Sequence, residues 1–213
     1  MLNMGRKTVL YGVHQFILHP VYLALAWKRL YGPIRDPRLL VAFAVHDLGY
    51  FTTNVTELDS EEGERHVEFG ADLMARLFGP EWGDFTRYHS RYYSSKAGVP
   101  FSRLCVADKL APTLEPEWLY RLRVHATGEV WEYTWHYCFG KYRADQGVRG
   151  PLNISEQDFR DRRRTPAVQA AMRDWQRHTM TFLRDWAYAH RDQGTPEPGA
   201  RPTPTPRTQG AQP

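Results

Sequence analysis

Residues 36–50 read DPRLLVAFAVHDLGY and combine a strongly apolar run with a histidine-aspartate pair. Asp36 and Pro37 suit the opening of a helix, and the apolar residues that follow occupy nearly all of its sides. Such a run predicts a central, buried helix that ends shortly after the pair. The last turn of this helix then carries His46 and Asp47.

Asp47 lies at the end of this apolar helix, where a carboxylate is costly unless a hydrogen-bond partner or a metal ion compensates its charge. On the pair alone, an aspartate that orients or caps a structural histidine is the favoured interpretation. Further histidines and an aspartate on the neighbouring predicted helices change this interpretation.

The rest of the chain has a helical pattern, and the strict alternation that is typical of strands is hard to find. We therefore predict an all-α domain over residues 1–190. Residues 191–213 are predicted to be a disordered Pro/Thr-rich tail, because their apolar surface is too small to offset the entropy of ordering. Besides the central helix, the predicted helices cover residues 20–31, 63–77, 81–94, 101–114, 117–123, 129–142 and 167–190.

The composition argues against several classes of protein. The chain has 213 residues, of which 42% are hydrophobic and 24% charged, and no apolar run has the length that crosses a bilayer. The first residues lack the sustained apolar stretch of a secretory signal, so we expect a cytoplasmic protein. Cys105 and Cys138 match neither a CxxC zinc site nor a disulfide framework. The net charge is +4, but the Lys and Arg residues are scattered among nearly as many acidic residues, so nucleic acid is not the expected partner. The oligomeric state stays open.

Five segments carry a histidine or an aspartate, and in chain order they are HPVYLALAWKRLYG (19–32), AFAVHDLGY (42–50), RHVEFGADLM (65–74), RYHSRYYS (87–94) and LCVADKLAP (104–112). Their order and approximate spacing resemble those of the HD superfamily of metal-dependent phosphohydrolases, in particular the bacterial diadenosine tetraphosphate hydrolases. The resemblance covers residues 18–115. It implies an HD-type helical bundle with additional C-terminal helices.

The resemblance also implies a dinuclear metal centre, in which Asp47 bridges two divalent ions. In this implied centre, the first ion is also bound by His19, His46 and Asp108, and the second ion by His66 and His89. Independently of any family, four imidazoles and two carboxylates are a mixed set that suits Fe, Mn, Zn or Ni. Two such ions clamp a phosphate and lower the pKa of a water for in-line attack. The predicted reaction is hydrolysis of a phosphoester or phosphoanhydride bond in a nucleotide or dinucleotide polyphosphate by a metal-bound hydroxide.

Several cationic side chains are candidates for binding the phosphate. An arginine offers a planar fork and a lysine a point charge. For each candidate the competing interpretation is a structural ion pair or a solvated side chain, which is favoured for Lys96. The candidate substrate-binding residues are Arg65, Arg91, Lys96 and Lys109, and the candidate catalytic residues are Asp47, Arg91 and Lys109.

The sequence leaves alternatives open. His14 lies five residues before His19 and is a second candidate for the same ligand position, although the spacing of His19 to the Ala-rich helix fits better. A mononuclear site needs only His19, His46, Asp47 and Asp108 as ligands, and His66 or His89 then contacts the phosphate. An HD-fold diiron oxygenase and a non-catalytic nucleotide or metal sensor are the competing functions. Residues 121–151, rich in Trp and Tyr, are expected to cover the mouth of the site.

Overall fold

The computed structural model describes residues 4–53, 61–140, 154–162 and 164–200, and in these ranges its regular elements are helices. An isolated β-bridge joins Ser102 to Thr195. The predicted all-α class is confirmed. None of the helices in the described ranges is both long enough and apolar enough to pass through a bilayer.

The helices follow one another along the chain as α-helices (α) and short 3-10 helices (η). They are α1 Met4–Tyr11, α2 Leu18–Tyr31, α3 Arg38–Val45, η1 Leu48–Phe51, α4 Glu61–Glu64, α5 His66–Phe78, α6 Pro80–Arg87, α7 Arg91–Ala97, α8 Arg103–Leu110, η2 Ala111–Leu114, α9 Glu117–Thr127, α10 Glu129–Phe139, α12 Glu156–Arg160 and α13 Pro166–Ala189. The helix predicted over 129–142 thus ends at Phe139, and residues 141 and 142 lie outside the described part.

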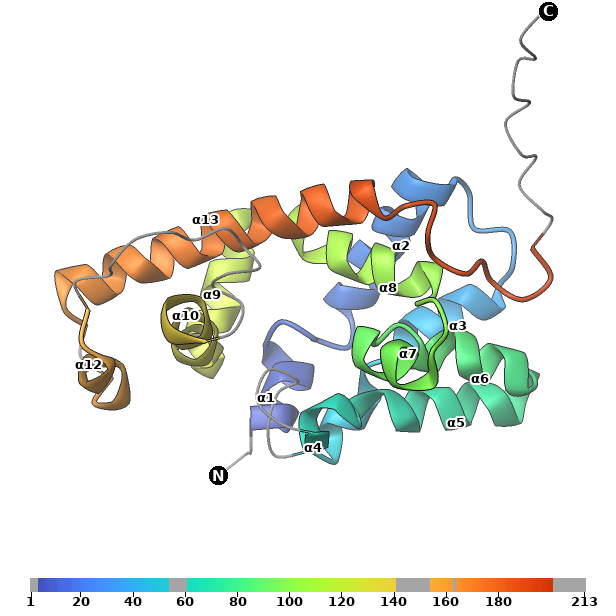
Figure 1. Ribbon diagram of the computed structural model, residues 1–213, viewed down its shortest axis with the longest axis horizontal. Coiled ribbons are helices and arrows are strands. Elements are labelled where there is room, and N and C mark those ends of the chain that lie inside the picture. Colours follow the sequence, from blue (N-terminus) through green and yellow to red (C-terminus); the bar gives the residue numbers. More distant parts are fainter. Residues whose placement is uncertain (1–3, 54–60, 141–153, 163, 201–213) are drawn as a thin grey trace, which may run out of the picture.

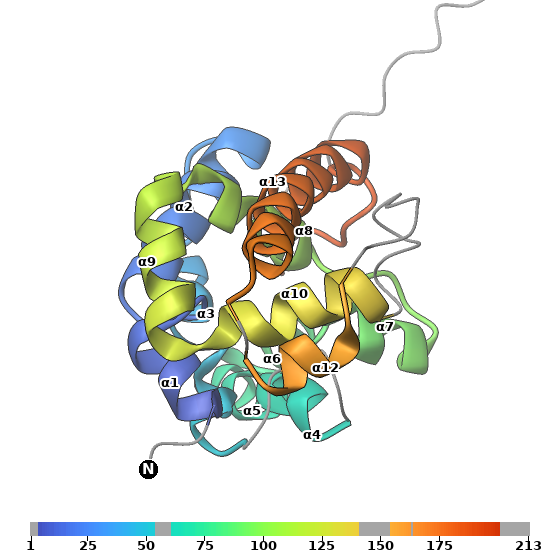
Figure 2. The ribbon, with the colours of Figure 1, turned by 90° about the vertical axis from the view of Figure 1, so that its left-hand side faces the viewer.

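Two groups of buried apolar side chains form the core. One lies among α2, α3, α5, α6 and α8 and includes Leu23, Phe43 and Leu104. The other lies among α9, α10, α12 and α13 and includes Trp175. Because Ala187 belongs to the first group, α13 contributes to both. Figure 1 shows α13 running along the top of the view from above α12 to above α8, and Figure 2 shows α9, α10 and α12 around its first half.

The helix predicted over residues 81–94 is interrupted. Helix α6 ends at Arg87 and α7 begins at Arg91, so His89 lies in the turn between them. Ser90 has an extended backbone (φ −78°, ψ 124°), and its hydroxyl accepts a hydrogen bond from Tyr93 N at 3.3 Å. A serine in this N-cap position stabilises the start of a new helix by about 1 kcal/mol. The prediction of one continuous helix is wrong here, because this local bond favours a restart.

The helix predicted over residues 63–77 is also divided. Helix α4 ends at Glu64 and α5 begins at His66, with Arg65 between them. The carbonyl oxygen of Gly63 accepts a hydrogen bond from His66 Nδ1 at 2.7 Å. A side chain that bonds to a nearby carbonyl competes with regular helix pairing, which accounts for the break.

The first part of the predicted disordered tail is bound to the domain. Thr195 N donates to Phe101 O at 2.8 Å, and Arg103 N donates to Thr195 O at 2.8 Å. Ser102 N in turn donates to Tyr88 O at 2.9 Å, beside the His89 turn. Backbone pairing therefore orders this segment although its composition is polar. Residues 201–213 lie outside the described part of the chain.

Candidate metal centre

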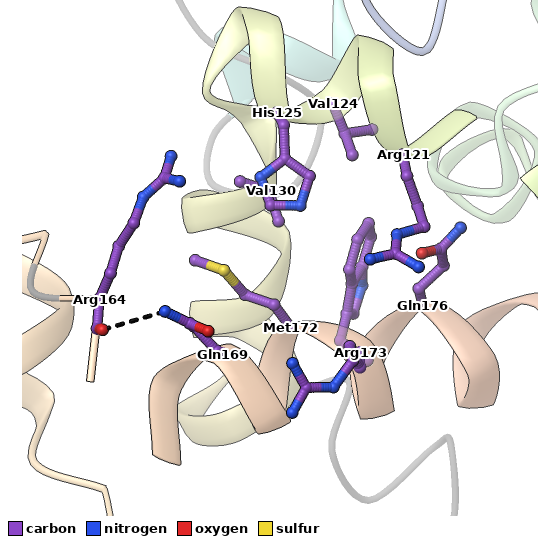
Figure 3. A pocket seen from close by; sticks show the side chains of 10 residues that line it. Arg121, Val124, His125, Val130, Arg164, Gln169, Met172, Arg173 and Gln176 are labelled. Atoms are coloured by element: carbon purple, nitrogen blue, oxygen red, sulfur yellow. Dashed lines mark hydrogen bonds between the residues drawn. The ribbon is translucent and has the colours of Figure 1, made fainter. Parts of the chain in front are cut away.

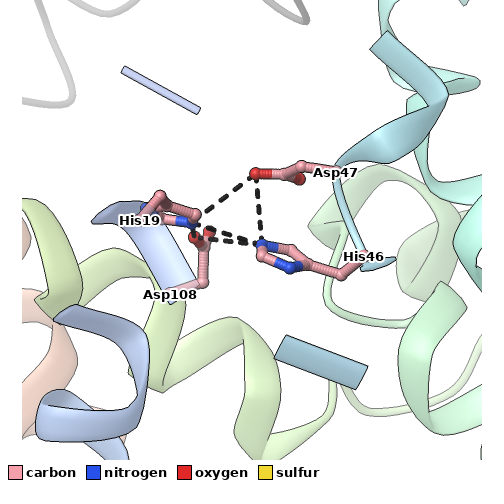
Figure 4. A group of neighbouring side chains, drawn as sticks. All are labelled: His19, His46, Asp47 and Asp108. Atoms are coloured by element: carbon pink, nitrogen blue, oxygen red, sulfur yellow. Dashed lines mark hydrogen bonds and ion pairs between the residues drawn. The ribbon is translucent and has the colours of Figure 1, made fainter. Parts of the chain in front are cut away.

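Six buried side chains from several helices converge, and they form two groups whose ligand atoms lie within 4.8 Å of one another. Figure 4 shows the side chains of the first group pointing toward one another. The groups are His19, His46, Asp47 and Asp108, and Asp47, His66 and His89. The structure thus brings together the side chains of all six predicted ligands, in two groups that share Asp47.

The first group is assembled from helix ends and one helix interior. His19 is the second residue of α2, His46 and Asp47 directly follow α3, and Asp108 lies in α8. His19 Nε2 lies 3.0 Å from Asp108 Oδ1, and His46 Nε2 lies 3.1 Å from Asp47 Oδ2. The two Nε2 atoms are 3.3 Å apart. Two imidazoles and two carboxylates therefore share one small volume.

Asp47 belongs to both groups because its two oxygens face different histidines. Oδ2 lies beside His46 Nε2, whereas Oδ1 lies 3.7 Å from His66 Nε2 and 3.4 Å from His89 Nε2. One carboxylate oxygen of Asp47 is thus directed to each group.

Three of the histidines are oriented in the same way by the backbone. Each ring donates from Nδ1 to the carbonyl of the residue three positions earlier, because a carbonyl oxygen only accepts. In the neutral ring, this fixes Nδ1 as the protonated nitrogen and directs the Nε2 lone pair toward Asp47. The bonds join His46 to Phe43 at 3.0 Å, His66 to Gly63 at 2.7 Å and His89 to Thr86 at 2.6 Å.

His89 shows most clearly that this set fits a metal ion. Its Nε2 is buried and makes no hydrogen bond within the described part of the chain. It nevertheless lies 3.4 Å from Asp47 Oδ1, which is also an acceptor. Two buried acceptors at this separation repel each other unless a cation lies between them. Nitrogen and oxygen ligands of this kind suit a divalent metal ion.

The electrostatics of the cluster favour a bound cation. Burial alone would raise the pKa of Asp47, but His46 and His14 hold that pKa well below its ordinary value. The pKa of Asp108 is likewise lowered despite its burial, by Lys109 and the histidines. Burial opposes the charged form of His46, yet the two carboxylates raise its pKa to about 10. In the metal-free protein, a proton on His46 therefore occupies the position of a cation.

Metal binding is expected to release about one proton per chain at neutral pH, because a ligand histidine must be neutral. The pKa of His46 is raised, so its proton is held below pH 10 and lost above it. Apparent metal affinity should accordingly rise with pH up to that value. Calorimetric titration of the metal-free protein in buffers of different ionisation enthalpy measures the released protons. Uptake of protons, or an affinity that falls as the pH rises from 7 to 9, would contradict the proposed site.

His14 has a different position from His19. Its Nδ1 lies 2.7 Å from Asp47 Oδ2, and its ring packs against Tyr50 with centroids 4.7 Å apart. His19 instead contacts Asp108 and His46. The structure thus gives the two histidines separate roles, with His19 in a ligand group and His14 bonded to Asp47.

A cleft of about 930 Å³ opens beside the metal centre, with His14, His19, His89 and Asp108 in its lining. This volume is typical of a site for a small organic ligand. The lining also has an aromatic part, the aromatic wall, which belongs to the part of the chain without predicted site residues. Its residues on α10 and α13 are Tyr133, Tyr137, Trp175, Phe182 and Trp186. Part of segment 121–151 therefore lines the site, whereas residues 141–151 lie outside the described part.

Two of the four candidate substrate-binding residues line this cleft. Arg91 places its guanidinium carbon 5.3 Å from the centre of the Trp186 ring, and Lys109 Nζ lies 3.3 Å from Asp108 Oδ2. The other two are absent from the cleft lining: Arg65 pairs with Glu68 at 3.2 Å and Lys96 pairs with Glu61 at 3.4 Å. Both are exposed ion pairs of the kind that contributes little to stability.

Comparison with known proteins gives no identification. No protein-family model matches this chain, and no curated protein or solved structure matches it either. The resemblance to the HD superfamily rests on the five quoted segments and stays a prediction. The geometry of the ligand groups and the cleft is an independent observation.

A second, smaller cavity of about 200 Å³ lies between α9 and α13. It includes Arg121, Arg164 and Arg173, but Figure 3 shows the guanidinium groups of Arg164 and Arg173 pointing in different directions. None of the predicted site residues lines it. Because its charged groups do not converge, the large cleft is the better candidate for substrate binding.

Proposed function

We propose that the protein is a metal-dependent phosphohydrolase that cleaves a phosphoester or phosphoanhydride bond of a nucleotide or a dinucleotide polyphosphate. The observation that carries this proposal is the placement of Asp47, whose two oxygens face two separate groups of ligands. A bridging carboxylate of this kind is suited to two ions a few ångströms apart, as in dinuclear phosphatases. The same placement is less suited to a mononuclear site.

The residues of the two groups would hold the ions, with His19, His46, Asp47 and Asp108 on one and Asp47, His66 and His89 on the other. When bound, two divalent transition-metal ions supply Lewis acidity and lower the pKa of water. The chain itself contributes positive charge, since Lys109 and Arg91 line the cleft beside the ligands. A lysine and an arginine there neutralise phosphate oxygens, and the arginine adds a planar fork of donors.

The aromatic wall of the cleft supports a nucleotide as the substrate. Tyr133 on α10 and Trp186 on α13 line the same cleft as the ligand His89. Stacking of a base on an aromatic ring contributes roughly 1–3 kcal/mol and accepts any base. The wall is therefore matched to the base of a substrate whose phosphate lies at the metal centre.

Elemental analysis of the purified protein, combined with phosphate release from AMP, ATP and diadenosine tetraphosphate, tests this function. We expect about two transition-metal ions per chain. Hydrolysis should continue without oxygen, because metal-assisted attack by water needs no oxidant. Chelation followed by return of Mn²⁺ or Fe²⁺ should abolish and then restore phosphate release.

Three outcomes would contradict the proposal. Bound iron with an oxygen-dependent product and no phosphate release would favour the diiron oxygenase. Metal or nucleotide binding without turnover of any of the three nucleotides would favour the sensor. A protein that binds no metal would remove the basis of both catalytic functions.

A further inference from the structure

The segment between α1 and α2 connects the metal centre to the C-terminal helices. Its His14 bonds through Nδ1 to Asp47 Oδ2 at 2.7 Å. Because Asp47 belongs to both ligand groups, the position of His14 bears on the orientation of the bridging carboxylate. What holds His14 in place therefore matters for the metal centre.

A buried carboxyl group holds this segment. Glu129, the first residue of α10, is fully buried, and such a group is costly unless it is well hydrogen-bonded. Its oxygens accept hydrogen bonds from Val13 N at 3.2 Å and from Thr127 Oγ1 at 2.6 Å. A Cβ at Gly12 would lie 2.1 Å from Glu129 Oε2, so only glycine permits this close approach. The carboxyl group and the segment are thus packed directly against each other.

Thr8 completes the connection. Its hydroxyl donates to Glu129 Oε1 and accepts from His14 N at 3.4 Å, and the side chain is fully buried. Hydrogen bonds therefore run without a gap from Glu129 through Thr8 and His14 to Asp47. Residues in one such network are energetically coupled.

We propose that Glu129 is a positioning residue of the metal centre: through Thr8 and Val13 it fixes His14, and His14 orients Asp47 for the ions. The inference rests on the proposed metal centre but not on the reaction that it catalyses. Tyr133 also donates to Glu129 Oε1, at 3.4 Å, and lines the cleft. The same carboxyl group therefore contacts both the support of the ligands and the wall of the cleft.

Four variants of the full-length protein test the proposal. Glu129→Gln replaces one of the two acceptor oxygens with a donor amide, so the carboxyl group can no longer accept from both Thr8 and Val13. Thr8→Val removes the hydroxyl, whereas Thr8→Ser keeps it. Thr134→Val is the matched control, because Thr134 is also fully buried, on the same helix as Glu129, and its hydroxyl has no partner within the described residues. Co²⁺ serves as the probe, since its affinity and visible absorption report on the ligands. The ¹⁵N resonance of His14 Nδ1 in the metal-free protein is a second readout that needs no metal.

Glu129→Gln and Thr8→Val are expected to weaken Co²⁺ binding by about tenfold or more, as loss of ligand-orienting partners does. They should also change the Co²⁺ spectrum and shift the His14 resonance. Thr8→Ser and Thr134→Val should behave like the wild type in all three respects. Equal losses in Thr134→Val would show general destabilisation and overturn the inference, as would wild-type spectra and resonances in Glu129→Gln. A wild type that binds no Co²⁺ would overturn the proposed metal centre and the inference together, whereas Co²⁺ binding that is unchanged in Glu129→Gln would overturn the inference alone.

Discussion

Asp47→Asn is expected to lose metal from both ligand groups and to lower kcat by more than about a hundredfold, because even loss of a partner that only orients a ligand costs 10–100-fold. Asparagine has the same shape but no charge, and its amide nitrogen donates where a carboxylate oxygen accepts. The amide nitrogen therefore faces either the group of His46 or the group of His66 and His89, where it repels the bound ion instead of binding it. Elemental analysis and steady-state kinetics with a nucleotide measure both losses.

Asp72→Asn is the matched control for this prediction. Asp72 lies on α5 with its side chain 59% exposed, in an ion pair with Arg87 at 3.1 Å. An exposed pair contributes at most about 1 kcal/mol, so metal content and kcat should stay at wild-type values. If Asp47→Asn retained two ions per chain and full turnover, the bridging role would be wrong.

Gly70→Ala is expected to lower the free energy of unfolding by about 2–3 kcal/mol and to weaken metal binding. A Cβ at this position on α5 would lie 2.4 Å from Val45 O and 2.9 Å from His46 Cα. Both atoms are backbone, so α3 and α5 must separate at the residue that provides a ligand. Alanine is the better helix former by about 1 kcal/mol, so a loss has to come from this contact. Thermal unfolding should show a decrease in Tm of roughly 4–10 °C.

Gly83→Ala is the control that separates the loss of stability in Gly70→Ala from its loss of metal affinity. On α6 the added Cβ would meet Ala75 Cβ at 2.7 Å, away from the ligand residues. We expect some loss of stability with wild-type metal affinity. Gly70→Ala protein that unfolds at the wild-type temperature and binds metal normally would show that α3 and α5 have more freedom than their contact indicates.

The ligand residues could be predicted because each carries a local signal. An aspartate after a fully apolar helix is costly without compensation, which singles out His46 and Asp47 from residues 36–50 alone. His66 and His89 have weaker signals, since a single histidine in a helix is more often structural. Their orientation depends on bonds to the carbonyls of Gly63 and Thr86, each just before a helix break. The capping preference of Ser90 is a local signal that indicates the second break.

The cleft and the supports of the ligands could not be predicted, because they join residues far apart in sequence. Glu129 meets Thr8 across 121 positions, and no local pattern indicates that pairing. The sequence left open whether His14 or His19 belongs to the ligand group, and only tertiary packing places His14 against Asp47 and His19 against Asp108. Helices α1 and α12 were not predicted either, since both are too short to show a helical period clearly.

The backbone bonds of Thr195 also determine where this chain can be shortened for expression. A truncation at residue 190, where the apolar pattern ends, would remove the partners of Phe101 O and Arg103 N. Those atoms belong to the cleft lining and to the first turn of α8, the helix that carries Asp108. A truncation after residue 200 keeps these partners. For crystallisation or C-terminal labelling, the chain is therefore better ended after residue 200 than at residue 190, where the composition changes.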